Sequence, residues 1–380
     1  NGDNSNSGMS ADEAWYTLKP VHEVQFEPGD TVHLKRGCAW PSGLVIDDDG
    51  EENKPIKFTA YGEGNRPKIT NPGDLTRGIE VHANWVIVEE LTVENVHIDG
   101  VYIPEGYAYN VIRDLNITDV GSGITFNGHH NIATDNYIHD LHMIVNTPGG
   151  DDDYGATGIK FRGPYNEATY NRLVRCSAPS YDYETDGSGF DLLGNADGSL
   201  IYYNLVEDTA GFIEVGMDSA KNIIIAYNVS VNNGRFSWIH LTGDFSSEVE
   251  NFRVEHNTIV ELGNNSHWLI FGFRGDPNSD TFILRNNIIY VDDHWVVSNR
   301  DSFSYSHNLY HLEGGTVLGF DLGAGEQIAD PRFVDLAGRD FRLQSQSPAI
   351  DRGIDLGHTK DFEGNPVPIN AAPDVGAFEY

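Results

Sequence analysis

The sequence predicts an all-β chain that folds as a single right-handed parallel β-helix, a solenoid with inserted loops. Three observations predict it. A short apolar segment centred on an asparagine recurs along the chain, and a second set of strand-like segments keeps step with the first. The composition is the third: 41 of 380 residues are glycine, 11% are aromatic, and no long amphipathic helical pattern appears. That combination is typical of many short strands joined by tight turns.

The asparagine repeat indicates the architecture. Its consecutive spacings are 35, 33, 24, 29, 30 and 21 residues, so the shortest approach one solenoid coil and the longer ones contain inserted loops. Parallel strands stack about 4.8 Å apart, so one asparagine per coil is expected to form a ladder of side-chain amides that satisfies buried backbone groups. This ladder predicts a fold and no activity. Its members are Asn136, Asn171, Asn204, Asn228, Asn257, Asn287 and Asn308.

The second set of strands places polar residues in one outward column. Each segment alternates, or nearly alternates, apolar and polar residues, which is the period of a strand with one face in the core. Placing Glu214 in the column requires a one-residue shift that points Ile213 and Val215 inward. The segments begin at Gly123, Gly158, Gly189, Gly211, Trp238 and Trp268. The predicted column is Thr125, Lys160, Asp191, Glu214 and His240.

The two ends fit the same picture. Residues 26–40 and 55–70 have the pattern of early strands with Gly and Pro turns. We expect one domain over 1–380, with an N-terminal cap region at 1–25 and a closing segment at 331–380, because an open solenoid needs its terminal edges covered.

The net charge limits the classes of binding partner, and the cysteine content limits the chemistry expected of the thiols. With 58 acidic and 24 basic residues the formal net charge is −34, which argues against binding to nucleic acid or to anionic membranes. No apolar run has the length of a membrane span. Cys38 and Cys176 are far apart in the sequence, and buried free thiols are expected rather than a redox or metal site. We expect a monomer.

The charged column predicts a site for an extended polymer. A solenoid face forms a long groove, and Lys, Asp, Glu and His on successive coils concentrate proton donors and acceptors there. The predicted catalytic residues are Lys160, Asp191, Glu214 and His240. The predicted substrate-binding residues are Arg162, Tyr181, Tyr183 and Arg274.

Two loops, at 139–157 and 177–189, interrupt the regular spacing beside this column. Their acidic residues suit calcium, which prefers oxygen ligands, although the spacing is not that of an EF-hand. Solvation of Gly- and Asp-rich loops is the structural alternative. The predicted Ca²⁺ ligands are Asp151, Asp152, Asp153, Glu184 and Asp186.

The segments DDDYGATGIKF, NRLVRC and TDGSGFDLLG, within 151–228, resemble right-handed β-helix polysaccharide-active enzymes, closest in pattern to polysaccharide lyases of the pectate-lyase type. By that resemblance Asp151, Asp152 and Asp153 match a calcium-binding acidic cluster, and Lys160 and Asp191 match strand positions. The resemblance implies a secreted, periplasmic or extracellular enzyme, a Ca²⁺ cofactor and an acidic polysaccharide substrate. The sequence differs from the family pattern just after GFDL, where Leu193 occupies the position of a catalytic lysine.

Two chemistries remain open, and the resemblance favours the first. A lyase that cleaves a uronate-containing or sulfated polysaccharide by β-elimination would use Lys160 or His240 as base, with Arg162 or calcium on the substrate carboxylate. A retaining glycoside hydrolase would use Asp191 and Glu214 as a carboxyl pair. A uronan C5-epimerase needs the same parts as the lyase, and a non-catalytic glycan-binding β-helix would not need the charged column.

Overall fold

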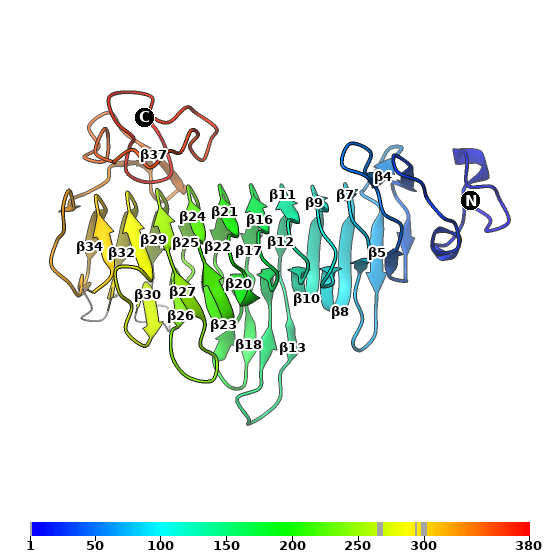
Figure 1. Cartoon of the computed structure of the whole chain (residues 1–380), viewed down its shortest axis with the longest axis horizontal. Helices are drawn as coiled ribbons and strands as arrows, with labels where there is room; N and C mark the ends of the chain where they lie inside the picture. Colours follow the sequence, from blue (N-terminus) through cyan, green and yellow to red (C-terminus); the bar gives the residue numbers. More distant parts are fainter. Residues whose placement is uncertain (1, 264–268, 293–294, 298–301) are drawn as a thin grey trace.

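The computed structural model describes residues 2–263, 269–292, 295–297 and 302–380. Figure 1 shows an elongated stack of parallel strands, with the N-terminus at one end and the C-terminal segment beside the coils near the other. Two short 3₁₀ helices, η1 (Ala11–Glu13) and η2 (Lys19–His22), precede the first strand, and every later element of the described residues is a strand. The predicted parallel β-helix is confirmed. No helix in these described ranges is long and apolar enough to cross a membrane.

The solenoid has three faces, and successive coils contribute parallel strands to each face. The first face is one sheet in which strands from successive coils pair in order along the stack. Its strands are β1 (Thr31–Lys35), β4 (Ile56–Tyr61), β7 (Val86–Glu89), β9 (Val111–Arg113), β11 (Ile132–Thr134), β16 (Glu167–Thr169), β21 (Leu200–Tyr202), β24 (Ile224–Ala226), β28 (Phe252–Glu255), β31 (Phe282–Arg285) and β33 (Ser304–Ser306).

The second face follows the predicted asparagine positions. Two long strands, β8 (Thr92–Ile103) and β10 (Asn116–Phe126), bend so that their first halves belong to this face and their second halves to the third. The other strands of the second face are β2 (Ala39–Trp40), β5 (Lys68–Asn71), β12 (Tyr137–His139), β17 (Arg172–Val174), β22 (Leu205–Glu207), β25 (Val229–Val231), β29 (Thr258–Leu262), β32 (Ile288–Asp292), β34 (Leu309–Glu313) and β35 (Gln327–Ile328).

The third face carries the predicted charged column. Beside the second halves of β8 and β10 it contains β3 (Leu44–Ile46), β6 (Ile79–Val81), β15 (Thr157–Phe161), β20 (Ser188–Asn195), β23 (Ile213–Lys221), β26 (Ser237–His240) and β30 (Phe271–Arg274), and β27 (Glu248–Glu250) pairs with the end of β23. The strand predicted to begin at Trp268 starts outside the described residues; β30 occupies its place in the stack.

The asparagine ladder forms as predicted. The backbone N–H and Nδ2 of Asn136 both donate to Oδ1 of Asn171, at 3.1 and 2.9 Å, and the same pair of bonds repeats coil by coil to Asn308. Asn308 then donates to Glu326 at 2.7 Å. A buried donor left without its partner costs about 1–3 kcal/mol, so a repeated amide at this corner stabilises every coil.

A second ladder, which the repeat did not predict, lies at the corner between the third and first faces. The N–H of Asn110 donates to Oδ1 of Asn131 at 3.0 Å, and the N–H of Asn131 donates to Oδ1 of Asn166 at 2.9 Å. Ser199 continues it through its hydroxyl, which accepts the N–H of Asn166 at 3.2 Å.

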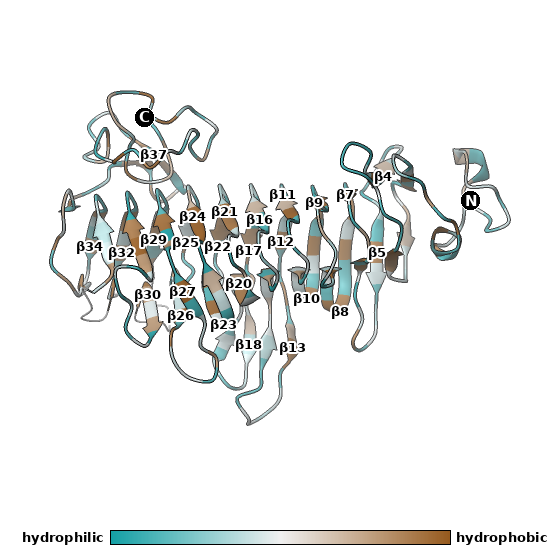
Figure 2. Ribbon diagram, viewed as in Figure 1, coloured by the Kyte–Doolittle hydropathy of each residue, from teal (hydrophilic) through white to brown (hydrophobic). Residues whose placement is uncertain are grey.

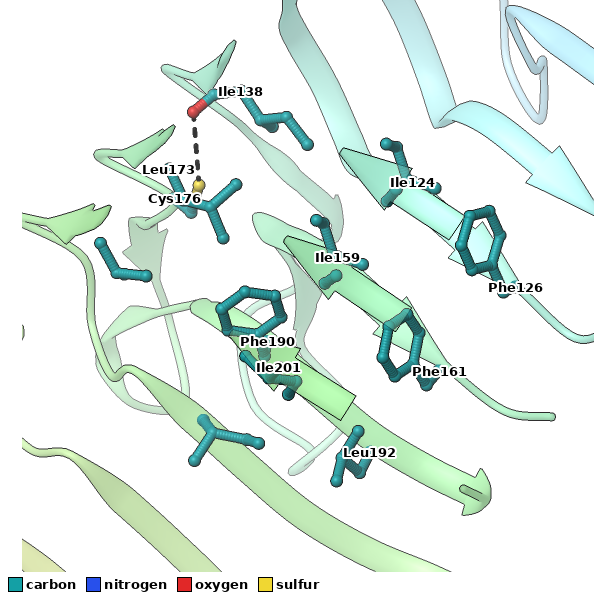
Figure 3. Close-up of a cluster of buried hydrophobic side chains, with 14 of the residues drawn as sticks. Ile124, Phe126, Ile138, Ile159, Phe161, Leu173, Cys176, Phe190, Leu192 and Ile201 are labelled. Carbon is teal, nitrogen blue, oxygen red and sulfur yellow. Dashed lines mark hydrogen bonds between the residues drawn. The ribbon is translucent and has the colours of Figure 1, made fainter. Parts of the chain in front are cut away.

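The core is built from stacked rows of like side chains. Along the strands apolar and polar residues alternate, as Figure 2 shows for β8 and β10. Inside, Ile124, Ile159 and Phe190 form one row across successive strands of the third face, and Phe126 and Phe161 stack in the next row with centroids 5.9 Å apart (Figure 3).

The two cysteines are free, as predicted. Cys176 is fully buried, with Sγ 3.9 Å from the carbonyl oxygen of Ile138 (Figure 3), and burial raises the pKa of its thiol. Cys38 is half-buried.

The segment after 330 runs along the side of the solenoid. It contains the hairpin of β36 (Phe333–Asp335) and β37 (Asp340–Leu343), and it packs apolar residues against β25, β29, β32 and β34 in a second hydrophobic cluster. Its contacts reach the middle of the stack, since Arg339 pairs with Glu207 of β22 at 2.7 Å. At the other end, Leu18 and Val21 from the region around η2 join the main core.

Candidate active site

Four charged or polar residues of the third face lie on successive strands in direct register. Thr125 of β10 pairs with Lys160 of β15, Lys160 with Asp191 of β20, and Asp191 with Glu214 of β23. Ile213 and Val215 are buried, so the one-residue shift expected for Glu214 is confirmed. Parallel strands lie about 4.8 Å apart, so the two carboxyl groups are neighbours on adjacent coils.

Asp191 is held by side chains on both of its oxygens. Thr157 Oγ1 donates to Oδ2 at 2.8 Å, Ser188 Oγ donates to Oδ1, and Lys160 Nζ lies 3.8 Å from Oδ2. The carboxyl is 8% exposed. Burial raises the pKa of Asp191, and the charge of Glu214 adds to the rise against the opposing charge of Lys160.

Glu214 has the opposite shift. Burial alone would raise its pKa, but the hydrogen bond with His240 Nε2, at 3.0 Å from Oε1, and the charges of Arg235, His240 and Lys160 lower it. Its side chain is 28% exposed, more than three times as much as that of Asp191. Two adjacent carboxyl groups whose pKa values are pushed apart can divide the roles of proton carrier and ionised group.

His240 does not lie in the column where the sequence pattern placed it. Glu214 pairs with Trp238, and His240 lies two residues further along β26, on the same face. The expectation was wrong because the inward position opposite Ile213 is occupied by Ser237, which is 0% exposed, and the apolar pattern does not reveal a buried serine. His240 reaches Glu214 from this new position, and its Nδ1 is buried without a partner among the described residues.

Arg235, which the sequence analysis missed, joins the site from the residues just before β26. Its side chain crosses Gly211, where an added Cβ would lie 3.3 Å from its Nε. Burial lowers the pKa of its guanidinium, against the charges of Glu214, Asp186 and Asp191. Asp186, at the end of β19 (Glu184–Asp186), has a pKa raised to about 6, first by burial and then by Glu214 and Asp191.

The predicted substrate-binding residues are exposed in two places, on the third face and on the second loop. Arg162 and Arg274 are exposed on the third face, and Arg274 is in register with His240. Tyr181 and Tyr183 are exposed on the second loop, 66% and 47%, and the hydroxyl of Tyr183 donates to Asp151.

The two predicted loops lie side by side and share an acidic cluster. They form the hairpins of β13 (Met143–Val145) with β14 (Tyr154–Gly155) and of β18 (Ala178–Ser180) with β19, and both project from the same edge in Figure 1. Asp152, Asp153 and Asp182 each place a carboxylate oxygen within 4.8 Å of the others. Asp182 was not among the predicted ligands. Asp151, Glu184 and Asp186 lie outside this group of three.

Backbone donors already bind these carboxylates. Asp182 Oδ2 accepts the N–H groups of residues 151, 152 and 153 at 3.1, 2.8 and 3.1 Å. Asp153 accepts the hydroxyl of Ser180 and the N–H groups of Thr147, Tyr181 and Asp182. Burial alone would raise the pKa of Asp153, but these four hydrogen bonds lower it. The donor set is all oxygen, which suits Ca²⁺, and three carboxylates supply part of the six to eight ligands it takes.

Known structures share the fold. Pectate lyase Pel9A is 18% identical over 100% of this chain and 94% of that chain, with a TM-score of 0.69. An alginate lyase from Paenibacillus sp. str. FPU-7 is 13% identical over 76% and 92%, and a GH136 lacto-N-biosidase from Eubacterium ramulus 16% identical over 87% and 66%, each with a TM-score of 0.51. No family model and no curated protein matches the sequence. The right-handed parallel β-helix, and the resemblance to β-helix polysaccharide-active enzymes, are confirmed.

Proposed function

We propose that this chain is a glycoside hydrolase that cleaves an acidic polysaccharide with retention of anomeric configuration, using Asp191 and Glu214. The observation that carries the proposal is the direct register of these residues on adjacent strands, combined with pKa shifts in opposite directions. Retaining enzymes hold their two carboxyl groups about 5–5.5 Å apart, close to one strand spacing.

The chemistry needs one ionised and one protonated carboxyl group. The ionised carboxylate attacks the anomeric carbon while the other carboxyl protonates the departing oxygen, and the resulting ester is then hydrolysed by water that gives its proton back to the second carboxylate. Lys160, Thr157 and Ser188 orient Asp191, and His240 orients Glu214.

An acidic substrate is supported by the cations that surround the pair. Lys160, Arg162, Arg235 and Arg274 gather on the third face of a chain whose formal net charge is −34. Cations placed beside the carboxyl pair of so acidic a protein favour an anionic partner. Alginate and pectate lyases with this fold act on such polymers by name, and we propose secretion on the same grounds.

A lyase is the second candidate, and the acidic cluster of the two loops favours it, because a lyase needs a cation on the substrate carboxylate. A lyase requires a base free to take the proton next to the uronate carboxylate. Lys160 Nζ lies 3.8 Å from Asp191, and His240 Nε2 is bonded to Glu214, so each candidate base is engaged by a carboxylate. For that reason we place the hydrolase first.

One assay separates these reactions. Pectate, alginate, glycosaminoglycans and sulfated algal glycans are incubated with calcium or with chelator, and both new reducing ends and ultraviolet absorbance of unsaturated uronate are followed. Reducing ends without absorbance are expected, and proton NMR of early product should show the anomer of the substrate. Absorbance that rises with the reducing ends would establish the lyase, and altered uronate configuration without cleavage would establish the epimerase. Binding without turnover would leave the glycan-binding module.

We further propose that Asp152, Asp153 and Asp182 hold a calcium ion that fixes the two loops beside the groove. The clustered carboxylate oxygens support this ligand class. Calcium would supply charge neutralisation at the loops, while the chain's own N–H donors orient the same carboxylates.

A further inference from the structure

A tryptophan stands next to the carboxyl pair in the column. Trp238 of β26 is the register partner of Glu214, so it lies one strand beyond the pair on the side away from Lys160. Its side chain is half-buried on the outward face. An aromatic residue at this position is the next surface that a polymer lying along the stack would meet.

The indole leans away from Glu214 and over the following strand. Gly272 of β30 is the register partner of Trp238, and a Cβ added to Gly272 would lie 2.1 Å from Cε3 and 2.5 Å from Cζ3 of the indole. The absence of a side chain at residue 272 therefore makes room for this orientation. Arg235 and His240 flank the indole, with their guanidinium carbon and ring centroid 5.5 and 6.1 Å from its centroid.

On the Asp191 side of the carboxyl pair, the column contains different side chains. Beyond Asp191 the column continues through Lys160 and Thr125 to Tyr102 of β8. The guanidinium of Arg77 covers the ring of Tyr102 at 3.9 Å, and the Tyr102 hydroxyl accepts a hydrogen bond from Asn127. Tyr102 therefore has a cation 3.9 Å from its ring centroid, whereas the cation over Trp238, Arg235, is 5.5 Å away and Trp238 is in register with Glu214.

We infer that Trp238 is a sugar-binding residue whose indole packs against the pyranose ring bound next to Glu214, in an orientation that Gly272 permits. The inference rests on the proposed hydrolase. Pyranose rings present C–H faces that pack on aromatic surfaces, and tryptophan offers the largest such surface with a polar N–H at its edge. Burying part of an indole face in this way is worth about 10- to 30-fold in affinity.

The inference is tested by a double-mutant cycle on Trp238→Ala and Gly272→Ala. The substrates are oligosaccharides of two to six units from the polymer that gives reducing ends in the panel above. Each single substitution is expected to raise KM about 10- to 30-fold with a smaller change in kcat. In the Trp238→Ala background the methyl at residue 272 no longer meets the indole, so Gly272→Ala is expected to have almost no further effect.

Substrate length gives an independent readout. The KM penalty of Trp238→Ala is expected only for oligosaccharides long enough to reach the position beyond Glu214, and Trp238→Phe is expected to restore part of the affinity. Tyr102→Ala, in the same column but with its ring covered by Arg77, serves as the matched control. Thermal unfolding of every variant separates lost binding from lost folding.

The outcomes distinguish this inference from the proposed function. If Glu214→Gln abolishes hydrolysis while Trp238→Ala and Gly272→Ala leave KM unchanged at every length, the hydrolase stands and the sugar-binding role is wrong. The same role is overturned by penalties that are additive in the cycle or equal for all lengths. If Glu214→Gln remains active, the hydrolase itself is wrong and the inference falls with it.

Discussion

Two acidic clusters lie on the same side of the solenoid and differ in what holds their carboxylates. In the loop cluster, Asp153 and Asp182 accept mainly backbone N–H groups, which are fixed in place and cannot lose a proton. On the third face, Asp191 and Glu214 form the carboxyl pair, and they are held by hydroxyls, an ammonium and an imidazole. Backbone donors stabilise one charge state and one geometry, whereas side-chain donors leave a carboxyl group able to change its protonation.

This difference supports the proposed division between a structural cluster and a reactive one. The pKa of Asp153 is lowered by its hydrogen bonds, so the loop carboxylate is fixed in its ionised form. The pKa of Asp191 is raised and that of Glu214 lowered, so the carboxyl pair contains unlike neighbours. Substitutions at matched positions of the two clusters test this difference.

The largest effect is expected at the carboxyl pair of the third face. Asp191→Asn and Glu214→Gln should each lower kcat by about 10³-fold or more, because each removes a group that acts in the transition state. Asp152→Asn, in the loop cluster, should stay within a few-fold of the wild type with calcium present. Turnover of aryl glycosides with good and poor leaving groups identifies the roles, since only loss of the acid/base is relieved by a good leaving group. Equal losses in both clusters would remove the distinction.

The second largest effect is expected at Lys160, the cation beside Asp191. Lys160→Met should lower kcat/KM about 10- to 100-fold at neutral pH, because it removes the cation that orients Asp191 and that would bind an acidic substrate. The charge of Lys160 also opposes the rise of the Asp191 pKa. Without that charge the Asp191 pKa rises further, so the limb of the pH–rate profile that belongs to Asp191 should move to higher pH. Lys221→Met is the control, because Lys221 pairs with Glu248 at the far end of β23. A profile that moves to lower pH would contradict the assigned electrostatics.

A smaller effect concerns stability. Asp153→Asn should lower the melting temperature by a few degrees, because the amide cannot accept the full set of four donors and one of its own atoms becomes a donor. Asp152→Asn should change it less, since Asp152 accepts a single hydroxyl, that of Thr147, in addition to any metal. Differential scanning calorimetry in chelator measures both, and a larger loss at Asp152 would reverse this ranking.

The smallest effect is expected from calcium. Saturating Ca²⁺ should raise the melting temperature by about 1–3 °C over chelator, as expected for a ligand that binds the folded state alone. Asp182→Asn should remove that increment, whereas Glu184→Gln, on a residue outside the cluster, should keep it. An increment that survives in Asp182→Asn would place the ion elsewhere.

The fold could be predicted because its signal is repeated. One asparagine per coil occupies the same corner, so several weak local patterns reinforce one another from Asn136 to Asn308. The second ladder escaped notice because Asn110, Asn131 and Asn166 are few and interrupted by Ser199.

The site could be predicted only in part. Lys160, Asp191 and Glu214 were placed in register because their inward neighbours are apolar. On the next coil the pattern predicts His240 beside Glu214, because an apolar residue is expected at the inward position that the buried Ser237 occupies. The residue in register with Glu214 is Trp238. Arg235 precedes its strand and Asp182 lies in a loop, so no periodicity marks either residue, and only the three-dimensional structure brings them to their clusters.

The C-terminal segment has a consequence for how the solenoid comes apart. In a simple stack each coil interacts with its two neighbours, so an end can fray one coil at a time. Here a single segment bonds several coils between β22 and β31: Arg339 bonds Glu207, His358 bonds Glu255, and the N–H of Gly376 donates to the carbonyl of Asn286. These coils must therefore open together once the segment detaches. Their hydrogen exchange should show one shared opening step instead of a gradient toward the end.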